Sequence, residues 1–174
     1  MPQYFFILGQ NKNLSIAEIA GLKDIGFSAK SAKLVNDVLL ADFFQSIEAP
    51  ELINRLGGVI KIGQIFEKNL DFNNLTAAEL IKLINFNPSH KVYFGFSHYG
   101  ENQNNVSKIS RRINSLALEI KKIFKEKGIA SRWVTSRQTQ LSSVIVEKEH
   151  LLDQGAELVL IEDRNKFYLG KTLV

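Results

Sequence analysis

The sequence predicts a mixed α/β fold of the α+β kind, built from two successive domains. Apolar runs with the period of strands alternate with amphipathic, helix-like segments along all 174 residues. Before residue 67 these segments follow the order β-α-β-β-α-β, and after it a long basic helix lies among four strand-like runs. A chain of this length with 45% hydrophobic residues can bury one or two cores. We place the two domains at residues 1–68 and 69–174.

The first strand and the first helix come from two local patterns. Tyr4–Leu8 is a continuous apolar run, which predicts a central strand buried on both faces. Ser15 and Glu18 have the spacing of a capping box, and Leu14 and Ile19 are placed for a hydrophobic staple. We therefore expect a helix that begins at Ser15.

The remaining segments of the first domain complete an alternating order. We predict two strands joined by a tight Asn-Asp turn, then a helix opened by a proline, then an alternating strand. The order of the domain through residue 66 is the ferredoxin-like arrangement, an antiparallel sheet with two helices on one face. A polar stretch without an apolar period then predicts a linker. These segments are Ala32–Val35, Val38–Phe43, Glu51 to Gly57, Val59–Phe66 and the linker Glu67–Leu75.

The second domain is predicted to be a separate α/β unit. Thr76 and Glu79 form a second capping-box pattern, and a polar, exposed loop is expected at His98–Asn105. A helix of about six turns follows, with its apolar residues three and four apart, and Gly128 lies where a left-handed cap is expected. The strands and the last helix are expected at Lys91–Ser97, Arg132–Thr135, Ser142–Gln154, Ala156–Ile161 and Lys166–Leu169.

Composition narrows the class of protein. The chain contains no cysteine, which excludes disulfide frameworks, thiolate zinc sites and cysteine nucleophiles, and is compatible with a reducing compartment. The longest apolar runs are too short to span a bilayer, and the run that follows Met1 lacks the basic region and cleavage site typical of a secretion signal. We therefore expect a soluble cytoplasmic protein without a membrane partner.

The positive charge of the chain is concentrated in one segment. Residues 106–137 contain nine Lys or Arg and two Asp or Glu, whereas the formal charge of the whole chain is only +4. Such a cluster is typical of a surface that binds a polyanion. A solvated helix face rich in lysine has the same pattern, and charge alone does not separate the two interpretations.

The sequence shows no catalytic constellation. Its glycine spacings lack the Lys-Ser/Thr of a phosphate loop, and Gly57-Gly58 precedes a strand rather than a helix. His90, His98 and His150 are isolated, so we assign no metal site and no catalytic residue.

The basic segment does carry the groups that phosphate recognition uses. Long cations lie beside Arg137 and the hydroxyls of Ser142 and Ser143, with an aromatic residue, Trp133, nearby. Each group also has a structural explanation: Ser142 is a candidate N-cap, and Trp133 in a strand is more often a core residue.

Several segments together resemble the THUMP domain of RNA-modifying enzymes. In the second half they are Gly128–Val134, Leu141–Val144, Leu151–Leu152, Gly155–Ile161 and Tyr168–Thr172. Three segments of the first half, Tyr4–Gly9, Leu14–Ile19 and Leu56–Ile62, are similar to one branch of these enzymes. That branch is the archaeal and eukaryotic type of tRNA guanine-N2 methyltransferase that acts at position 10, in which a ferredoxin-like domain precedes THUMP. Trp133 and Lys171 depart from the pattern of the family, which usually has Phe or a β-branched residue and Arg there.

The resemblance implies a tRNA-binding module that grips the acceptor stem near the single-stranded 3′ end. No S-adenosylmethionine loop or catalytic motif follows, so we expect a non-catalytic chain without a cofactor of its own. The methyltransferase domain, with S-adenosylmethionine, would then act in cis or in trans. The residues that we expect to bind RNA are Arg111, Arg112, Lys121, Lys122, Lys125, Arg132, Arg137, Ser142 and Ser143.

Two alternatives remain open from the sequence. A THUMP module could serve thiouridine or pseudouridine synthesis instead of methylation. A ferredoxin-like fold could also bind a small molecule or another protein, because this fold hosts many functions.

Overall fold

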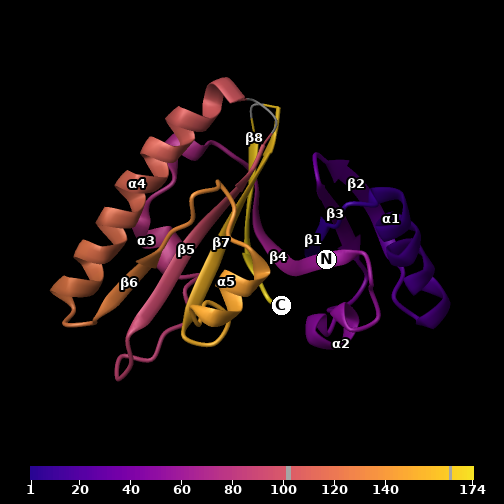
Figure 1. The fold of residues 1–174 in the computed structure, drawn as a ribbon, viewed down its shortest axis with the longest axis horizontal. Coiled ribbons are helices and arrows are strands. Elements are labelled where there is room, and N and C mark those ends of the chain that lie inside the picture. The colour runs from indigo at the N-terminus through magenta and orange to yellow at the C-terminus, as the bar shows by residue number, and fades with distance from the viewer. Residues whose placement is uncertain (101–102, 165) are drawn as a thin grey trace.

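A computed structural model describes residues 1–100, 103–164 and 166–174 (Figure 1). The elements of the first half are β1 (Gln3–Leu8), α1 (Lys12–Gly21), η1 (Leu22–Ile25), β2 (Ala29–Val35), β3 (Val38–Phe43), α2 (Ala49–Ile53) and β4 (Val59–Leu70). Those of the second half are η2 (Phe72–Asn74), α3 (Ala77–Ile81), β5 (Val92–Tyr99), α4 (Gln103–Glu126), β6 (Ser131–Val134), α5 (Ser143–Lys148), β7 (Gly155–Asp163) and β8 (Lys166–Thr172).

The described residues form one eight-stranded sheet, in the order β2-β3-β1-β4-β8-β7-β5-β6. Strand β5 pairs in parallel with β6 and β7, and the other neighbouring strands are antiparallel. The predicted mixed α/β fold is therefore confirmed. Strands β2 and β6 are the two edges of the sheet.

The first half has the predicted ferredoxin-like order. Its strands lie in the order β2-β3-β1-β4, and β1 is fully buried along its length. Tyr4, Phe6 and Leu8 face one side and pack with Ile19 of α1 and Leu52 of α2. Burial of these apolar side chains holds both helices against the same face.

The opposite face of this half packs against the second half of the sheet. Phe5 and Ile7 of β1 form a common core with Val159 and Ile161 of β7. In Figure 1 the two halves of the sheet diverge from β4, with α1 and α2 outside one half and α3 and α4 outside the other. Apolar side chains from both halves of the sheet therefore form the core between them.

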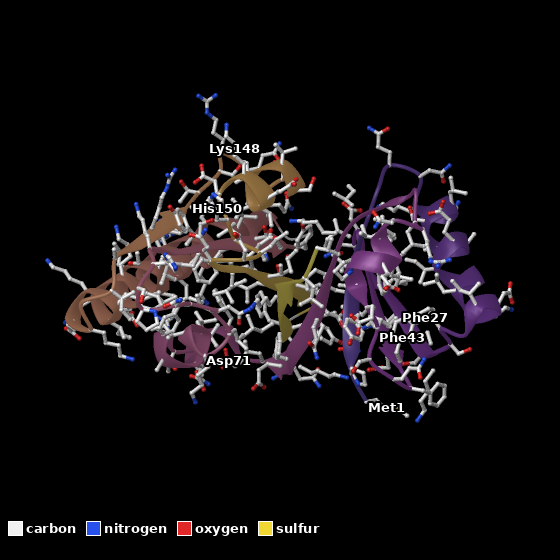
Figure 2. The ribbon with its side chains drawn as sticks, turned by 90° about the horizontal axis from the view of Figure 1, so that it is seen from below. Met1, Phe27, Phe43, Asp71, Lys148 and His150 are labelled. Carbon is white, nitrogen blue, oxygen red and sulfur yellow. The ribbon has the colours of Figure 1, made fainter. Side chains whose placement is uncertain are left out.

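The second half is covered by helices on both faces. Leu116, Ile120 and Phe124 of α4 pack on one face together with α3, and Val146 of α5 packs on the other. Figure 2 shows the same division, with Lys148 and His150 on one side of the sheet and Asp71, next to η2, on the other. Helices α4 and α5 therefore lie on opposite faces.

The predicted linker at Glu67–Leu75 is wrong for its first part. Strand β4 continues to Leu70 and pairs with β8, with register shifts on either side of Glu67. Such bulges bend a strand while its pairing continues, so the polar composition marks a bend rather than the end of the strand. The domain boundary at residues 68 and 69 remains a prediction. It falls within β4, whose pairing with β8 continues to Leu70.

The capping box predicted at Ser15 is also wrong. Helix α1 begins at Lys12, and its N-cap is Asn11, whose side chain accepts a hydrogen bond from the Leu14 amide. Ser15 is buried and donates to the Gly58 carbonyl at 2.6 Å, while the Glu18 carboxylate accepts from the Gly58 amide at 2.8 Å. Ser15 and Glu18 therefore bind α1 to Gly58, the residue that precedes β4.

Other local predictions are confirmed. Thr76 and Glu79 form a reciprocal capping box at α3, and Ser142 is the N-cap of α5. Asn36 and Gly128 have positive φ angles of 56° and 71°, as the predicted turn and helix cap require.

The bounds predicted for the exposed loop, residues 98–105, are only partly correct. His98 and Tyr99 belong to β5 and are buried, and residues 101 and 102 lie outside the described part. Among the described residues, no helix has the length and apolar character needed to cross a membrane.

Candidate nucleic-acid interface

Helix α4 separates its apolar and polar residues as predicted. Ile109, Leu116, Ile120 and Phe124 are buried, whereas the basic residues of the last three turns are exposed. With about 100° between successive residues, Ser110, Asn114, Lys121 and Lys125 project from one flank of the helix. This flank faces β6, the edge strand of the sheet.

Two hollows follow one another along the groove between α4 and β6. The first, of about 570 Å³, lies at the C-terminal end of α4 and is lined by Lys121, Lys122, Lys125 and Gly128–Ser131. The second, of about 400 Å³, lies where β6 ends. Among the described residues, neither hollow is lined by an acidic side chain, so the groove presents only neutral and cationic groups.

The second hollow combines polar groups with one aromatic ring. Half-buried Trp133 packs against the core beneath α4 and also lines the hollow, so it serves the core and the surface together. Arg137 is exposed on the segment after β6 and forms no ion pair with another described residue. The other lining residues are Phe96, His98, Val106, Ser110, Ile113, Asn114, Val134, Thr135, Ser136, Gln138 and Thr139.

The segment between β6 and α5, residues 135–142, is held on strand β5. The His98 backbone amide donates to the Thr139 carbonyl at 2.9 Å. The side-chain amide of Gln140 donates to the His98 carbonyl at 3.1 Å. The Leu141 amide donates to the Ser97 hydroxyl at 2.8 Å. The exposed Arg137 therefore sits on a loop whose C-terminal part is fixed.

The structure brings four predicted RNA-binding residues to this groove. Lys121, Lys122 and Lys125 line one hollow and Arg137 lines the other. Lys122 also lies 3.9 Å from Glu126 across one helical turn, but both side chains are largely exposed. An exposed pair of this kind contributes little, so Lys122 stays available to an anion.

Two predicted residues of α4 lie outside the groove. Arg111 is exposed on the outer surface of the helix. The Arg112 guanidinium projects from the flank near α3, where Nη2 donates to the Leu75 carbonyl at 2.6 Å. A second contact reaches the Asn73 carbonyl at 3.4 Å. Arg112 therefore has a structural role that the sequence did not reveal.

The remaining three predicted residues lie near α5, on the opposite face. Arg132 is paired with Glu149 at 3.1 Å, and Ser142 is occupied as an N-cap that accepts from the Ile145 amide. Ser143 is exposed at the start of α5. The prediction that the cationic helix lies beside the start of α5 is therefore wrong: α4 and α5 pack on opposite faces of the sheet, and neither Ser142 nor Ser143 lines the groove.

Sequence reasoning missed the polar residues Ser110 and Asn114 of the groove. They lie four residues apart, and Lys121 follows at seven residues from Asn114, so the helical period already aligns them. The signal was present, but nothing in the sequence identified β6 as the partner of this flank.

The three histidines remain separate from any metal-binding arrangement. Among the described residues, no three His, Asp or Glu side chains are grouped in a way that could hold an ion. Burial lowers the pKa of His98, whose Nε2 lies 3.4 Å from a carboxylate oxygen of Glu162.

The fold is shared with solved structures of larger proteins. No family model and no curated protein matches this sequence. PH1313 from Pyrococcus horikoshii Ot3 matches 98% of this chain and 54% of its own, with 10% identity and a TM-score of 0.54. A 4-thiouridine synthetase in complex with RNA and ATP matches 99% of this chain and 41% of its own, with 13% identity and a TM-score of 0.53.

TrmN from Thermus thermophilus is a third match, over 99% of this chain and 46% of its own, with 10% identity and a TM-score of 0.53. The chain thus spans about half the length of these proteins. Each likeness covers nearly all of this chain, so it includes both halves, and what the proteins share at such low identity is the fold.

Proposed function

We propose that this chain is a THUMP-type RNA-binding module that holds an RNA in the groove between α4 and β6. The observation that carries the proposal is the lining of that groove. Lys121, Lys122 and Lys125 line one hollow, and Arg137 lines the other together with hydroxyl and amide side chains. Cations neutralise phosphates, and neutral polar groups complete the recognition of sugars and bases.

The aromatic residue Trp133 favours a single strand over a duplex as the ligand. Trp133 lines the second hollow and is half-buried, so part of its side chain is accessible to a ligand. Stacking on an aromatic ring requires an unpaired base, because a base within a duplex is already stacked on both faces. A single-stranded end is therefore the ligand that we propose.

The finer proposal concerns tRNA. The sequence resemblance supports the acceptor stem with its 3′ end as the ligand, and a tRNA guanine-N2 methyltransferase as the parent activity, with its S-adenosylmethionine-dependent domain in cis or in trans. The matched structures include a 4-thiouridine synthetase bound to RNA, with a likeness equal to that of TrmN. Thiouridine synthesis is accordingly the alternative parent activity.

The test is binding of a tRNA transcript followed by fluorescence anisotropy over a series of salt concentrations. If the four groove cations neutralise about four phosphates of a single strand, log K falls with log salt at a slope of about −3. Removal of the unpaired 3′ nucleotides from the transcript should weaken binding at least tenfold. Binding that does not depend on salt, or on the 3′ end, would contradict the proposal.

A matched pair of variants separates the groove from general charge. Lys121→Ala/Lys125→Ala should reduce the magnitude of the slope by about 1.4, since each lost phosphate contact contributes about 0.7. Lys23→Ala/Lys30→Ala removes the same charge from exposed positions in the first half and should leave the slope unchanged. Equal effects of the two variants would show that binding follows net charge rather than the groove.

A further inference from the structure

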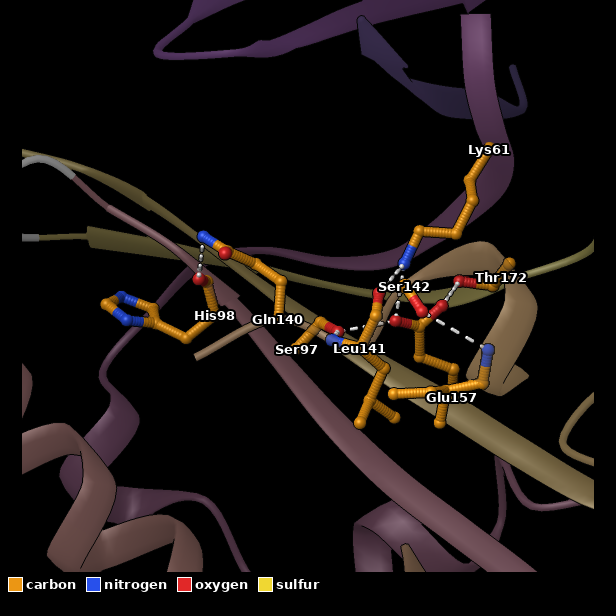
Figure 3. A network of polar contacts seen from close by, with 9 residues as sticks. Lys61, Ser97, His98, Gln140, Leu141, Ser142, Glu157 and Thr172 are labelled. Carbon is orange, nitrogen blue, oxygen red and sulfur yellow. Dashed lines mark hydrogen bonds and ion pairs between the residues drawn. The ribbon is translucent and has the colours of Figure 1, made fainter. Parts of the chain in front are cut away.

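A buried ion pair joins the two halves of the molecule. Lys61 of β4 lies 2.6 Å from Glu157 of β7, and their side chains are 2% and 0% exposed. The hydroxyls of Ser97 on β5 and Thr172 on β8 both donate to the same carboxylate. The network therefore links strands from both halves of the sheet (Figure 3).

The same network binds both backbone polar groups of Leu141, in the loop that carries Arg137. The Lys61 ammonium donates to the Leu141 carbonyl at 2.9 Å, and the Leu141 amide donates to the Ser97 hydroxyl at 2.8 Å. Both polar groups of Leu141 are thus bound to side chains of the network, as Figure 3 shows. Because these groups are buried, losing either partner leaves a costly unpaired atom.

Geometry explains why an ammonium group suits this position. Lys61 reaches Glu157 and Leu141, and its Nζ also lies 5.9 Å from the centre of the Tyr99 ring. An ammonium has three donors that can point in three directions, whereas an apolar side chain could fill the space without holding the loop. A buried ion pair in general adds little net stability compared with a well-packed apolar pair. Its distinctive contribution here is the orientation of Leu141.

We infer that Lys61 is a positioning residue of the RNA site, acting through Leu141 on the loop 135–142. The inference rests on the proposed function, and it assigns the first half a defined part in binding. Lys61 contacts no RNA in this scheme. It holds Leu141, which terminates the loop, so that Arg137 is presented at the groove and Ser142 begins α5 in a fixed place.

The experiment compares the double variant Lys61→Met/Glu157→Gln with the wild-type chain. The two substitutions remove both charges together, so no unpaired ion is left in the core. Amide hydrogen exchange of the peptide covering residues 136–142 should accelerate about tenfold or more, with exchange in α4 unchanged. Affinity for the tRNA transcript should fall about tenfold. Leu52→Ala, a core truncation in α2, destabilises the first half and should change neither the loop exchange nor the affinity of the folded protein.

A thermodynamic cycle with Arg137→Ala identifies the route of the effect. If Lys61 acts by presenting Arg137, the double variant should cost little further affinity once Arg137 is absent. Independent, multiplying losses would overturn the inference, as would a folded double variant whose loop exchange matches that of the wild type. Should the double variant not fold, Ser97→Ala keeps the ion pair, removes the acceptor for the Leu141 amide together with one hydrogen bond to Glu157, and carries the same expectation for the loop.

The two proposals fail in different ways. Absence of tRNA binding by the wild-type chain would refute the RNA-binding function. Unchanged exchange in residues 136–142 would refute the role of Lys61, whether or not RNA binds.

Discussion

Arg112 tests whether a basic residue of α4 outside the groove stabilises the fold rather than binds RNA. Its guanidinium donates to the carbonyls of Leu75 at 2.6 Å and Asn73 at 3.4 Å, which ties α4 to the segment before α3. Hydrogen bonds made by charged groups contribute about 1.5 to 3 kcal/mol. The side chain is 30% exposed and one contact is long, so we take the lower value, about 1.5 kcal/mol, for Arg112→Ala. This corresponds to a fall in Tm of about 3 to 6 °C for a chain of this size.

Arg111→Ala is the matched control, because it removes the same charge from the preceding residue of the same helix. Arg111 is exposed, and among the described residues its side chain contacts only the Ser107 carbonyl of its own helix, through Nε at 3.3 Å. Its replacement should change the free energy of unfolding by less than about 0.5 kcal/mol. Urea denaturation followed by circular dichroism measures both variants. If Arg112→Ala kept full stability but lost tRNA binding, Arg112 would belong to the RNA surface and our assignment would be wrong.

Two further predictions test the sheet and its charges. A side chain at Gly155 would place Cβ 1.6 Å from the Tyr93 carbonyl oxygen, so Gly155→Ala should separate β5 from β7 and cost more than about 4 kcal/mol, measured by urea denaturation. At Gly21 an added Cβ would meet no atom of another segment within 4 Å, so Gly21→Ala should be neutral or stabilising, and equal stability of the two variants would contradict the geometry. The Ser31 hydrogen bond and then Lys68 lower the pKa of Asp42 below its ordinary value of 3.8. The stabilisation from Asp42 is therefore present above about pH 4 and lost as the pH falls through its folded pKa. Ser31→Ala should raise the Asp42 pKa in an NMR titration, and an unchanged value would exclude the hydrogen bond as the main cause.

Local pattern was sufficient where the interactions themselves are local. The capping box of Thr76, the left-handed turn at Asn36 and the cap at Gly128 depend on residues within a few positions of one another, and all three are present. The order of strands and helices in the first half was likewise predictable, because burial imposes a period on each segment. The cluster of positive charge in residues 106–137 is also a property of the sequence alone.

Ser15 and Glu18 show where local reasoning ends. Their spacing fits a capping box, but Gly58, forty residues from Glu18, offers both a carbonyl and an amide at the same place. A buried polar group takes whichever partner the packing brings to it, and such a partner leaves no local signal. The same reason explains Arg112, whose acceptors lie 37 and 39 residues away.

The sequence by itself determined the kinds of elements, their order and the amount of positive charge that one helix carries. Only the tertiary structure decided which cations share a groove, because that depends on β6 lying beside one flank of α4 and on α5 lying across the sheet. It also decided that Lys61 is buried against Glu157, 96 residues away, rather than exposed on a strand. These arrangements arise from contacts between segments that are distant in the sequence. The free energy gained when such segments are buried together depends on all of them, so no single segment predicts it.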